Sequence, residues 1–333
     1  MKKTSAFLLI MAMALNYAFA QTTIANGGLE NWTAVGQATE EPQFWNSNKT
    51  GGGQAGSSFA PQTCYREASN PHTGTYCARV VSGSTFGIVV NGSLTTGRVE
   101  APSTNKPEGY IRTIANDPAF GMAFTARPDS LIFWYRYTSV SGDYPRVEAR
   151  LHVGNAYTPE TPVNGNHPDS TINIIARAQW TGATASVSGW TRVSIPFVYV
   201  DSRTPQFILI TTTSSGDQTG GAANSTLWLD DFDVYYQPAV FVGTISPTTY
   251  YVSATSGSAI NIPFILQGQF TAGNTVTAQL SDSSGSFANA VNIGSAIATT
   301  SGSITATIPA ASSNGIAYRN AFSNLYPSAH FHC

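Results

Sequence analysis

The sequence predicts an all-β protein. Segments that alternate between apolar and polar residues recur along the chain, and Gly, Pro, Asn or Asp bounds most of them. Helical periodicity is almost absent. The chain is 42% hydrophobic and 11% aromatic, which is enough to build a core. This density of short strands is typical of sandwiches, jelly rolls and barrels.

The N-terminus has the pattern of a secretory signal peptide over residues 1–20. Lys2 and Lys3 precede an apolar stretch, and small residues at Ala18 and Ala20 precede Gln21. No later stretch approaches the roughly 20 apolar residues that a membrane span needs. We therefore expect an exported protein without a membrane span, found in the periplasm, at the cell surface or outside the cell.

Charge excludes some classes of partner. Only 10% of the residues are charged, and the formal net charge is -2. Such a balance gives no electrostatic reason to expect nucleic acid or an acidic membrane surface as a partner.

Two cysteines suit an oxidising compartment. Cys64 and Cys77 flank the segment YREASNPHTGTY, which looks like two strand ends joined by a turn. We expect a disulfide between them. The alternative is an unbridged pair that faces the core. Cys333 remains without a partner.

A domain boundary is expected near Gln237-Pro238, which separates residues 21–238 from residues 239–333. The second part has the strand count and spacing of a smaller immunoglobulin-like β-sandwich. It resembles the modules repeated in exported bacterial surface proteins. The resemblance ends after residues 315–319, so we expect this module to be incomplete at its C-terminus relative to a longer parent.

The last strand of the first domain, residues 225–236, carries adjacent aspartates. Strict alternation places Asp230 on an apolar face with Trp228 and Phe232, and Asp231 on a wetter face. A carboxylate that leaves water needs a cation or several hydrogen-bond donors. Calcium is the natural cation outside the cell. The alternative is that backbone or arginine donors satisfy the carboxylate.

The first domain resembles the putative carbohydrate metabolism domain family. Segments that carry the resemblance occur in the expected order, namely NGGLENW, EPQFWNS, FTARPDSLIFWYRYTSVSGDYPRVEARL, WTRVSIPFVYV, TPQFILITTTSS and NSTLWLDDFDVYY. The resemblance implies an exported, galactose-binding-like jelly roll. It also implies a structural calcium between the first and last strands, with Glu30 and Asp230 as ligands.

A candidate ligand-binding surface lies on the segment LIFWYRYTSVSGDYPRVEARLHV, which we interpret as a hairpin. The five candidate residues share the face opposite the apolar one: Trp134, Arg136, Arg146, Glu148 and Arg150. Aromatic rings stack on sugar rings, and charged side chains bind hydroxyls. The alternative is a solvated face with cross-strand Arg/Glu pairs. Further candidates for the rim of a site are the loop aromatics Trp32, Trp45, Tyr65, Tyr110 and Tyr144.

No catalytic motif is present, so we assign no catalytic residue. The function that the sequence favours is non-catalytic binding of a glycan. One alternative is a structural or adhesive module whose partner is a cell-envelope protein. Another is a glycoside hydrolase, which requires two carboxylates about 5 to 10 Å apart in a cleft.

Overall fold

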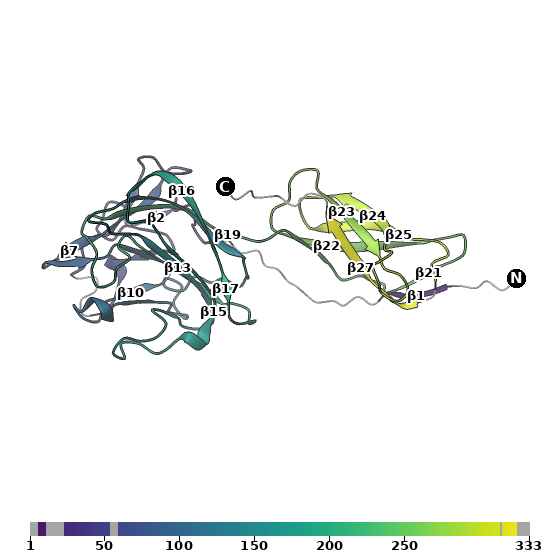
Figure 1. The fold of residues 1–333 in the computed structure, drawn as a ribbon, viewed down its shortest axis with the longest axis horizontal. Helices are drawn as coiled ribbons and strands as arrows, with labels where there is room; N and C mark the ends of the chain where they lie inside the picture. Colours follow the sequence, from purple (N-terminus) through teal and green to yellow (C-terminus); the bar gives the residue numbers. More distant parts are fainter. Residues whose placement is uncertain (1–5, 11–22, 54–58, 314, 325–333) are drawn as a thin grey trace. The chain divides into compact units, whose positions relative to one another are not determined.

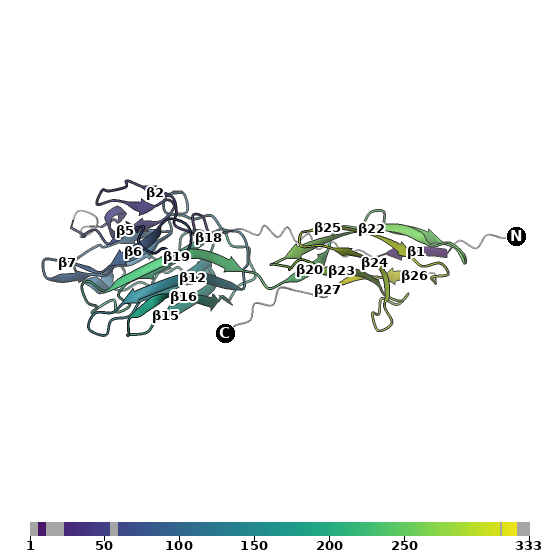
Figure 2. The same cartoon turned by 90° about the horizontal axis from the view of Figure 1, so that it is seen from above.

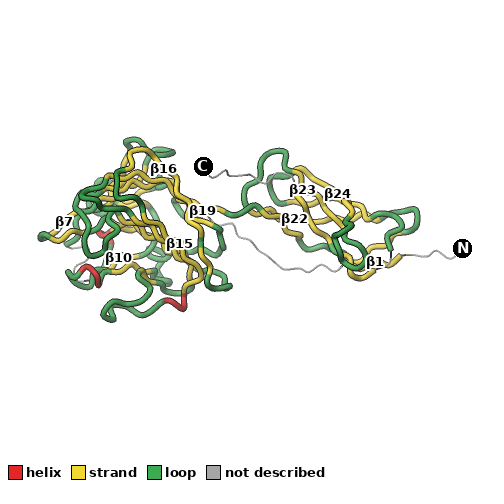
Figure 3. Tube along the Cα trace, in the orientation of Figure 1, coloured by secondary structure: helices red, strands yellow, loops and turns green. Residues whose placement is uncertain are grey.

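The computed structural model describes residues 6–10, 23–53, 59–313 and 315–324 (Figure 1). The chain divides into two compact units: Ala20–Tyr235, and a second unit that combines Met1–Phe19 with Tyr236–Cys333. Regular structure is nearly all β-strand, as Figure 3 shows, which confirms the predicted fold class. None of the helical turns in the described part of the chain has the length or apolarity that crossing a bilayer requires.

The unit Ala20–Tyr235 is a β-sandwich built on two large sheets (Figure 2). The five-stranded sheet has the order β16 (Val187–Pro196), β12 (Ser130–Thr138), β19 (Thr226–Tyr235), β6 (Cys77–Val81), β5 (Cys64–Glu67). The six-stranded sheet has the order β17 (Val198–Tyr199), β15 (Ile174–Thr181), β13 (Arg146–His152), β18 (Phe207–Thr213), β9 (Ser93–Thr95), β4 (Asn46–Ser47). This architecture confirms the predicted jelly-roll sandwich.

This unit also contains smaller sheets. Their strands are β2 (Trp32–Thr33) with β3 (Glu41–Pro42), β7 (Gly83–Thr85) with β8 (Ile88–Val90), and β10 (Arg98–Glu100), β11 (Tyr110–Arg112) and β14 (Tyr157–Thr158). The third group lies over the outer face of the six-stranded sheet and forms one wall of the cavity described below.

The core follows from the alternation in β12. Every second side chain of this strand is buried, beginning with Leu131 and Phe133. The Phe133 ring contacts Phe232 of its own sheet at 5.4 Å between centroids and Trp180 of the facing sheet at 5.5 Å. The buried Tyr137 donates its hydroxyl hydrogen to the carbonyl oxygen of Ser214 at 2.9 Å, so the phenol does not remain unsatisfied.

The prediction that residues 131–153 form a hairpin is wrong. β12 pairs with β16 and β19, whereas β13 pairs with β15 and β18 in the other sheet. The apolar faces of β12 and β13 therefore meet across the core, and their polar faces point to opposite sides of the sandwich. The length of the connecting segment, residues 139–145, allows the chain to cross from one sheet to the other.

A β-bulge in β19 changes which residues share a face. Trp134 lies opposite Asp230, but Ile132 lies opposite Asp233, so β19 contains one extra residue between these pairs. Asp231 takes the left-handed conformation there, with φ of 48°. As a result, Leu229 and Phe232 both face the core, and Asp230 lies on the outer face. This corrects the strict alternation expected for residues 225–236.

The N-terminal segment packs directly on this bulge. The backbone N–H of Phe232 donates to the carbonyl oxygen of Gly27 at 2.8 Å. A Cβ atom at Gly27 would lie 2.0 Å from the carbonyl oxygen of Phe232. Only glycine permits this approach of two backbones. The segment NGGLENW and the last strand of the unit therefore meet, as expected for this fold.

The predicted disulfide between Cys64 and Cys77 is corrected by the strand register. Both cysteines are buried and free. They lie on adjacent strands, but Cys64 pairs with Val80, three residues along β6 from Cys77. Three residues span about 10 Å of a strand, which exceeds the Cα separation that a disulfide allows. The alternative expected from the sequence is therefore present: the two cysteines are buried and not bridged.

The second unit contains three small sheets in its described residues. They are β20 (Ala239–Val242), β22 (Ser258–Gln267) and β25 (Gly302–Ile308); β24 (Val291–Ile297), β23 (Thr275–Leu280) and β27 (Asn320–Asn324); and β21 (Thr249–Val252), β1 (Ala6–Ile10) and β26 (Gly315–Tyr318). One buried apolar cluster, which includes Ile262 and Val276, joins them. The immunoglobulin-like assignment of this unit stays a prediction. Apart from β1, the predicted signal peptide lies outside the described residues, and so does Cys333.

We predict that Gly27→Ala destabilises the unit Ala20–Tyr235 by about 1–3 kcal/mol, because the added methyl group forces the N-terminal segment away from Phe232. The measurement is urea unfolding of the wild type and the variant. Gly189→Ala is the matched control, since no atom lies within 4 Å of a Cβ atom at that position. Equal destabilisation of both variants would contradict the prediction.

Candidate functional site

Asp230 is the most deeply buried carboxylate on the outer side of the five-stranded sheet, with 0% exposure. The loop of residues 70–76 covers it. Its Oδ2 atom accepts hydrogen bonds from the backbone N–H groups of His72 at 2.9 Å and Thr73 at 3.4 Å, and its Oδ1 atom accepts one from its neighbour Asp231 at 2.9 Å. The backbone of the loop thus supplies the donors that a buried carboxylate requires.

Burial and the neighbouring charge of Asp231 raise the pKa of Asp230 to about 7 despite these hydrogen bonds. The same loop also contacts the other predicted calcium ligand. Glu30 accepts hydrogen bonds at Oε1 from the N–H groups of Thr75 at 2.9 Å and Tyr76 at 3.3 Å. Glu30 and Asp230 are therefore held by one short loop, at the place where the N-terminal segment meets β19.

Glu30 and Asp230 provide carboxylate oxygens, which are hard ligands of the kind that calcium takes. The loop of residues 70–76 directs backbone N–H groups at both carboxylates, so the hydrogen bonds of the alternative expected from the sequence are present. A cation would further offset the cost of the buried Asp230 charge. Among the described residues, no group of three His, Cys, Asp or Glu side chains is placed to hold a metal ion. Carbonyl or water oxygens would have to complete the coordination sphere.

An aromatic cluster lies beside Asp230 on the same outer face. The His72 ring stacks on Trp134 with 3.8 Å between centroids, and its Nδ1 atom lies 2.5 Å from Oδ2 of Asp231. Arg136 lies over the rings of Trp190 and Trp228, at 4.8 and 4.9 Å from their centroids. His72 thus occupies one face of Trp134, and the cluster fixes the loop of residues 70–76 on the sheet.

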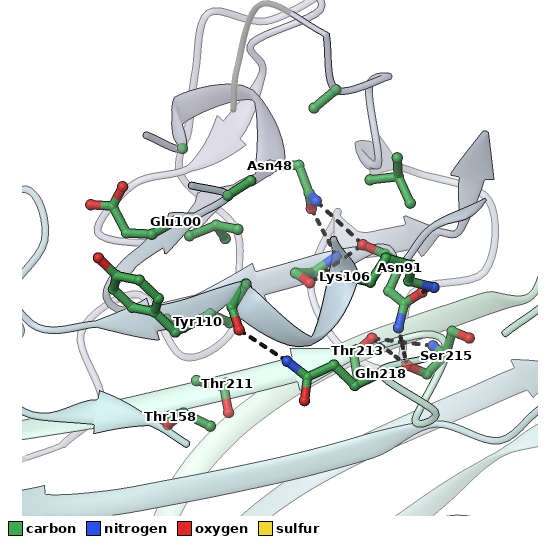
Figure 4. Close-up of a pocket in the computed structure, with 18 of the residues that line it drawn as sticks. Asn48, Asn91, Glu100, Lys106, Tyr110, Thr158, Thr211, Thr213, Ser215 and Gln218 are labelled. Carbon is green, nitrogen blue, oxygen red and sulfur yellow. Dashed lines mark hydrogen bonds between the residues drawn. The ribbon is translucent and has the colours of Figure 1, made fainter. Parts of the chain in front are cut away.

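The opposite outer face, on the six-stranded sheet, carries a cavity of about 820 Å³ (Figure 4). Its floor includes a row across three strands, because Gln179 of β15, Glu148 of β13 and Thr211 of β18 lie directly opposite one another. Tyr110 of β11 and Thr158 of β14 line one side. The volume lies in the upper part of the range of small-molecule binding sites, which is roughly 300–1,000 Å³.

A chain of ion pairs fixes the charged part of the floor. Glu148 pairs with Arg146 and, at 2.8 Å, with Arg150. Arg150 also donates from Nε to Glu160 at 2.9 Å, and Glu160 pairs with Arg177. The Glu148 and Arg150 side chains are 6% and 5% exposed, whereas the Arg146 side chain is 42% exposed. The network therefore holds rigid polar groups below the cavity, and Arg146 is its accessible end.

The second polar wall comes from loops. Lys106 donates from Nζ to Oδ1 of Asn91 at 3.0 Å, and Asn91 donates from Nδ2 to the carbonyl oxygen of Ser215 at 2.9 Å. Gln218 donates to the carbonyl oxygen of Gly109 at 2.9 Å. Burial lowers the pKa of Lys106. Figure 4 shows these side chains together across from Tyr110. Long-range side-chain bonds thus hold this wall in place.

Two buried hydroxyl groups at the cavity lack partners within the described part of the chain. They are the Oγ1 atom of Thr158 and the Oγ atom of Ser215. A buried hydroxyl normally forms at least one hydrogen bond, because desolvation without one is costly. Both oxygen atoms are themselves buried, so neither is exposed to a ligand in the cavity.

The acids at the cavity are all engaged by arginine. Glu100 pairs with Arg112 at 2.8 Å, and Glu148 and Glu160 belong to the network above. Burial alone would raise the pKa of Glu160, but hydrogen bonds and charges from Arg177 and Arg150 outweigh burial and lower it. This environment favours the charged form of Glu160, whereas a general acid must hold a proton.

The structure does not bring the five predicted ligand-binding residues together. Arg146, Glu148 and Arg150 line the cavity, whereas Trp134 and Arg136 belong to the aromatic cluster on the opposite outer face. The division follows from β12 and β13 lying in different sheets. Of the loop aromatics, Tyr110 lines the cavity, and Trp45 is buried in the core.

Most of the loop residues that line the cavity could not be recognised from the sequence as parts of one site. Asn91, Lys106 and Gln218 come from three separate connections, and no local pattern links them. Thr211 and Thr213 were detectable in part, since their alternation in residues 207–213 places both on one face of a strand. Nothing in the sequence showed which face of that strand would border a cavity.

Comparison with solved structures finds distant similarity to carbohydrate-binding modules and to an adhesin domain. The carbohydrate-binding module TmCBM61, solved in complex with beta-1,4-galactotriose, is 11% identical, with 64% of this chain and 92% of that chain covered and a TM-score of 0.30. The CBM22-1–CBM22-2 tandem of Paenibacillus barcinonensis Xyn10C is 10% identical, with 93% and 90% covered and a TM-score of 0.30. The adhesin domain of Epf from Streptococcus pyogenes is 10% identical, with 80% and 79% covered and a TM-score of 0.24. At these values the likeness indicates neither a ligand nor an activity.

No curated protein sequence matches the chain. A family model does match, over residues 19–235, and its bounds agree closely with those of the unit Ala20–Tyr235. The match covers more than half of the chain and includes both outer faces described above. The chain belongs to the putative carbohydrate metabolism domain family.

Proposed function

We propose that the unit Ala20–Tyr235 binds a carbohydrate in the cavity on its six-stranded sheet. The observation that carries this proposal is a preformed cavity whose lining combines apolar side chains with polar ones that ion pairs and hydrogen bonds hold in place. A sugar presents many hydroxyls that both donate and accept hydrogen bonds, so it matches such a lining. The family to which the unit belongs supports the same class of ligand.

The cavity suits binding better than glycoside hydrolysis. Its carboxylates are paired with arginines, and the pKa of Glu160 is lowered, whereas hydrolysis of a glycoside needs one carboxylic acid that keeps its proton. Rigid ion pairs provide oriented donors and acceptors without proton transfer. We therefore assign a non-catalytic role to this unit.

Calcium has a structural part in this proposal. Glu30 and Asp230 would hold the ion on the outer face opposite the cavity, together with carbonyl or water oxygens. The ion would supply positive charge beside a buried carboxylate. It would stabilise the contact between the N-terminal segment, the loop of residues 70–76 and β19, without touching the glycan.

Export is the remaining part of the proposal. It rests on the signal-peptide pattern of residues 1–20, and it places the protein where polysaccharides occur. Removal of this segment would also remove β1 (Ala6–Ile10) from the sheet that it forms with β21 and β26.

We predict that Arg146→Ala lowers the affinity for a glycan that the wild type binds about ten- to a hundredfold. The substitution removes the solvent-accessible charged donor in the floor of the cavity. Calorimetric titration with a panel of oligosaccharides measures the effect. Arg203→Ala is the matched control: this arginine is 44% exposed and pairs with Asp201 two residues away, but it does not line the cavity. Absence of glycan binding, together with capture of a cell-envelope protein, would favour the adhesive alternative.

We predict that Asp230 makes the free energy of unfolding depend on pH. The folded state raises the pKa of this group from 3.8 to about 7, so folding favours its protonated form. Without divalent cations, the contribution of Asp230 to the free energy of unfolding therefore declines as pH rises from about 4 to 7. Asp230→Asn lacks this decline, and added calcium at pH 7 raises the melting temperature of the wild type only.

Asp233→Asn is the control for that experiment, because Asp233 lies on the same strand but is exposed. It should keep both the pH dependence and the response to calcium. Identical pH profiles for the wild type and Asp230→Asn would contradict the prediction.

We predict that the exported protein begins at Gln21. Expression with the native N-terminus in a Gram-negative host, followed by N-terminal sequencing of the periplasmic fraction, tests this directly. A full-length chain that stays in the cytoplasm would contradict export.

A further inference from the structure

The hairpin β7–β8 contains a residue that the fold does not explain. Phe86 is at its tip, 84% exposed, and has φ of 52°. Gly87 follows with φ of 78°, so both turn residues are in the left-handed region, as in a type I′ turn. Asn or Gly normally takes the first of these positions, because a bulky side chain is strained there. Phe86 therefore lowers the stability of the folded protein in two ways, through its strained backbone and through its apolar ring exposed to water. It adds little to the core in return.

The same residue lines the cavity. Phe86 and Phe59 form a pair with 6.1 Å between ring centroids, and both belong to the cavity lining together with Ile88. Phe59 is 54% exposed and Ile88 is 37% exposed. Thr85 donates from Oγ1 to the carbonyl oxygen of Phe59 at 2.9 Å, which ties the hairpin to the segment that carries the second ring. We call Phe59, Phe86 and Ile88 the apolar arm.

The carboxylates at the cavity are all paired. Three cations, Lys106, Arg146 and Arg150, and three carboxylates, Glu100, Glu148 and Glu160, line it. Arg112 and Arg177 pair with Glu100 and Glu160 from outside the lining, so each carboxylate of the described lining has an arginine partner. The polar floor and the apolar arm together suit a ligand with neutral hydroxyls and exposed C–H faces.

We propose that the cavity takes an oligosaccharide of several units, one of which stacks on the apolar arm while others bind the polar floor. This inference rests on the proposed function and adds the length of the ligand and a second binding region. C–H faces of sugar rings pack on aromatic rings, and the cavity volume of about 820 Å³ suits more than a single sugar ring. Strain at residues that contact ligands is a known cost of function.

Phe86→Asn is the informative variant, because asparagine is favoured at the first position of a type I′ turn. It should keep or raise the melting temperature, and it removes the aromatic surface of the arm. The probes are neutral β-1,4-linked disaccharides and hexasaccharides of glucose, mannose, galactose and xylose, titrated calorimetrically. We expect the affinity for a bound hexasaccharide to fall about tenfold and the affinity for the disaccharide to stay unchanged.

Two further variants complete the test. Phe86→Tyr keeps the ring and should keep the affinity for the hexasaccharide. Ile172→Asn is the matched control, since Ile172 is 80% exposed but does not line the cavity, and it should change nothing.

The outcomes separate this inference from the proposed function. Unchanged hexasaccharide affinity in Phe86→Asn, with a loss in Arg146→Ala, would overturn the apolar arm and leave the proposed function standing. A lower melting temperature with equal loss for both ligand lengths would assign Phe86 a structural role and also overturn it. Failure of every hexasaccharide to bind the wild type would overturn both.

Discussion

The buried carboxylate of Asp230 is the constraint on which the jelly roll depends. It lies without solvent exposure on the outer side of the five-stranded sheet, so the protein must surround it with donors. The loop of residues 70–76 supplies them from its backbone and is in turn held by the stacking of His72 on Trp134. The bulge at Asp231 provides the contact of Phe232 with Gly27. One buried group therefore connects the beginning, the middle and the end of the unit.

This arrangement assigns different tasks to the two outer faces. On the five-stranded sheet, rings and cations are used to attach a loop, so Trp134 and Arg136 have partners from the protein itself. On the six-stranded sheet, the charged side chains are also paired, but they form the floor of an open cavity. A similar set of residue types thus stabilises the fold on one side and offers a binding surface on the other.

The cavity combines rigid polar groups with exposed apolar surface. Its ion pairs and loop contacts fix the positions of the polar groups, which lowers the entropic cost of binding a flexible ligand. At the same time, the exposed, strained Phe86 has no role in the core. Features that cost free energy in the free protein are expected where a ligand offsets that cost.

The all-β class, most strand positions and the apolar face of residues 130–138 could be predicted from the sequence, because alternation is a local property of a strand. The resemblance to the family also implied that Glu30 and Asp230 hold one calcium ion, which stays a prediction. The membership of β12 and β13 in different sheets, which separates Trp134 from Arg146, emerges only from the folded structure. So do the extra residue in β19, which lets Leu229 and Phe232 both face the core, and the strand register that keeps Cys64 and Cys77 apart. Sheet membership, bulges and register depend on contacts between distant segments, and no local pattern encodes them.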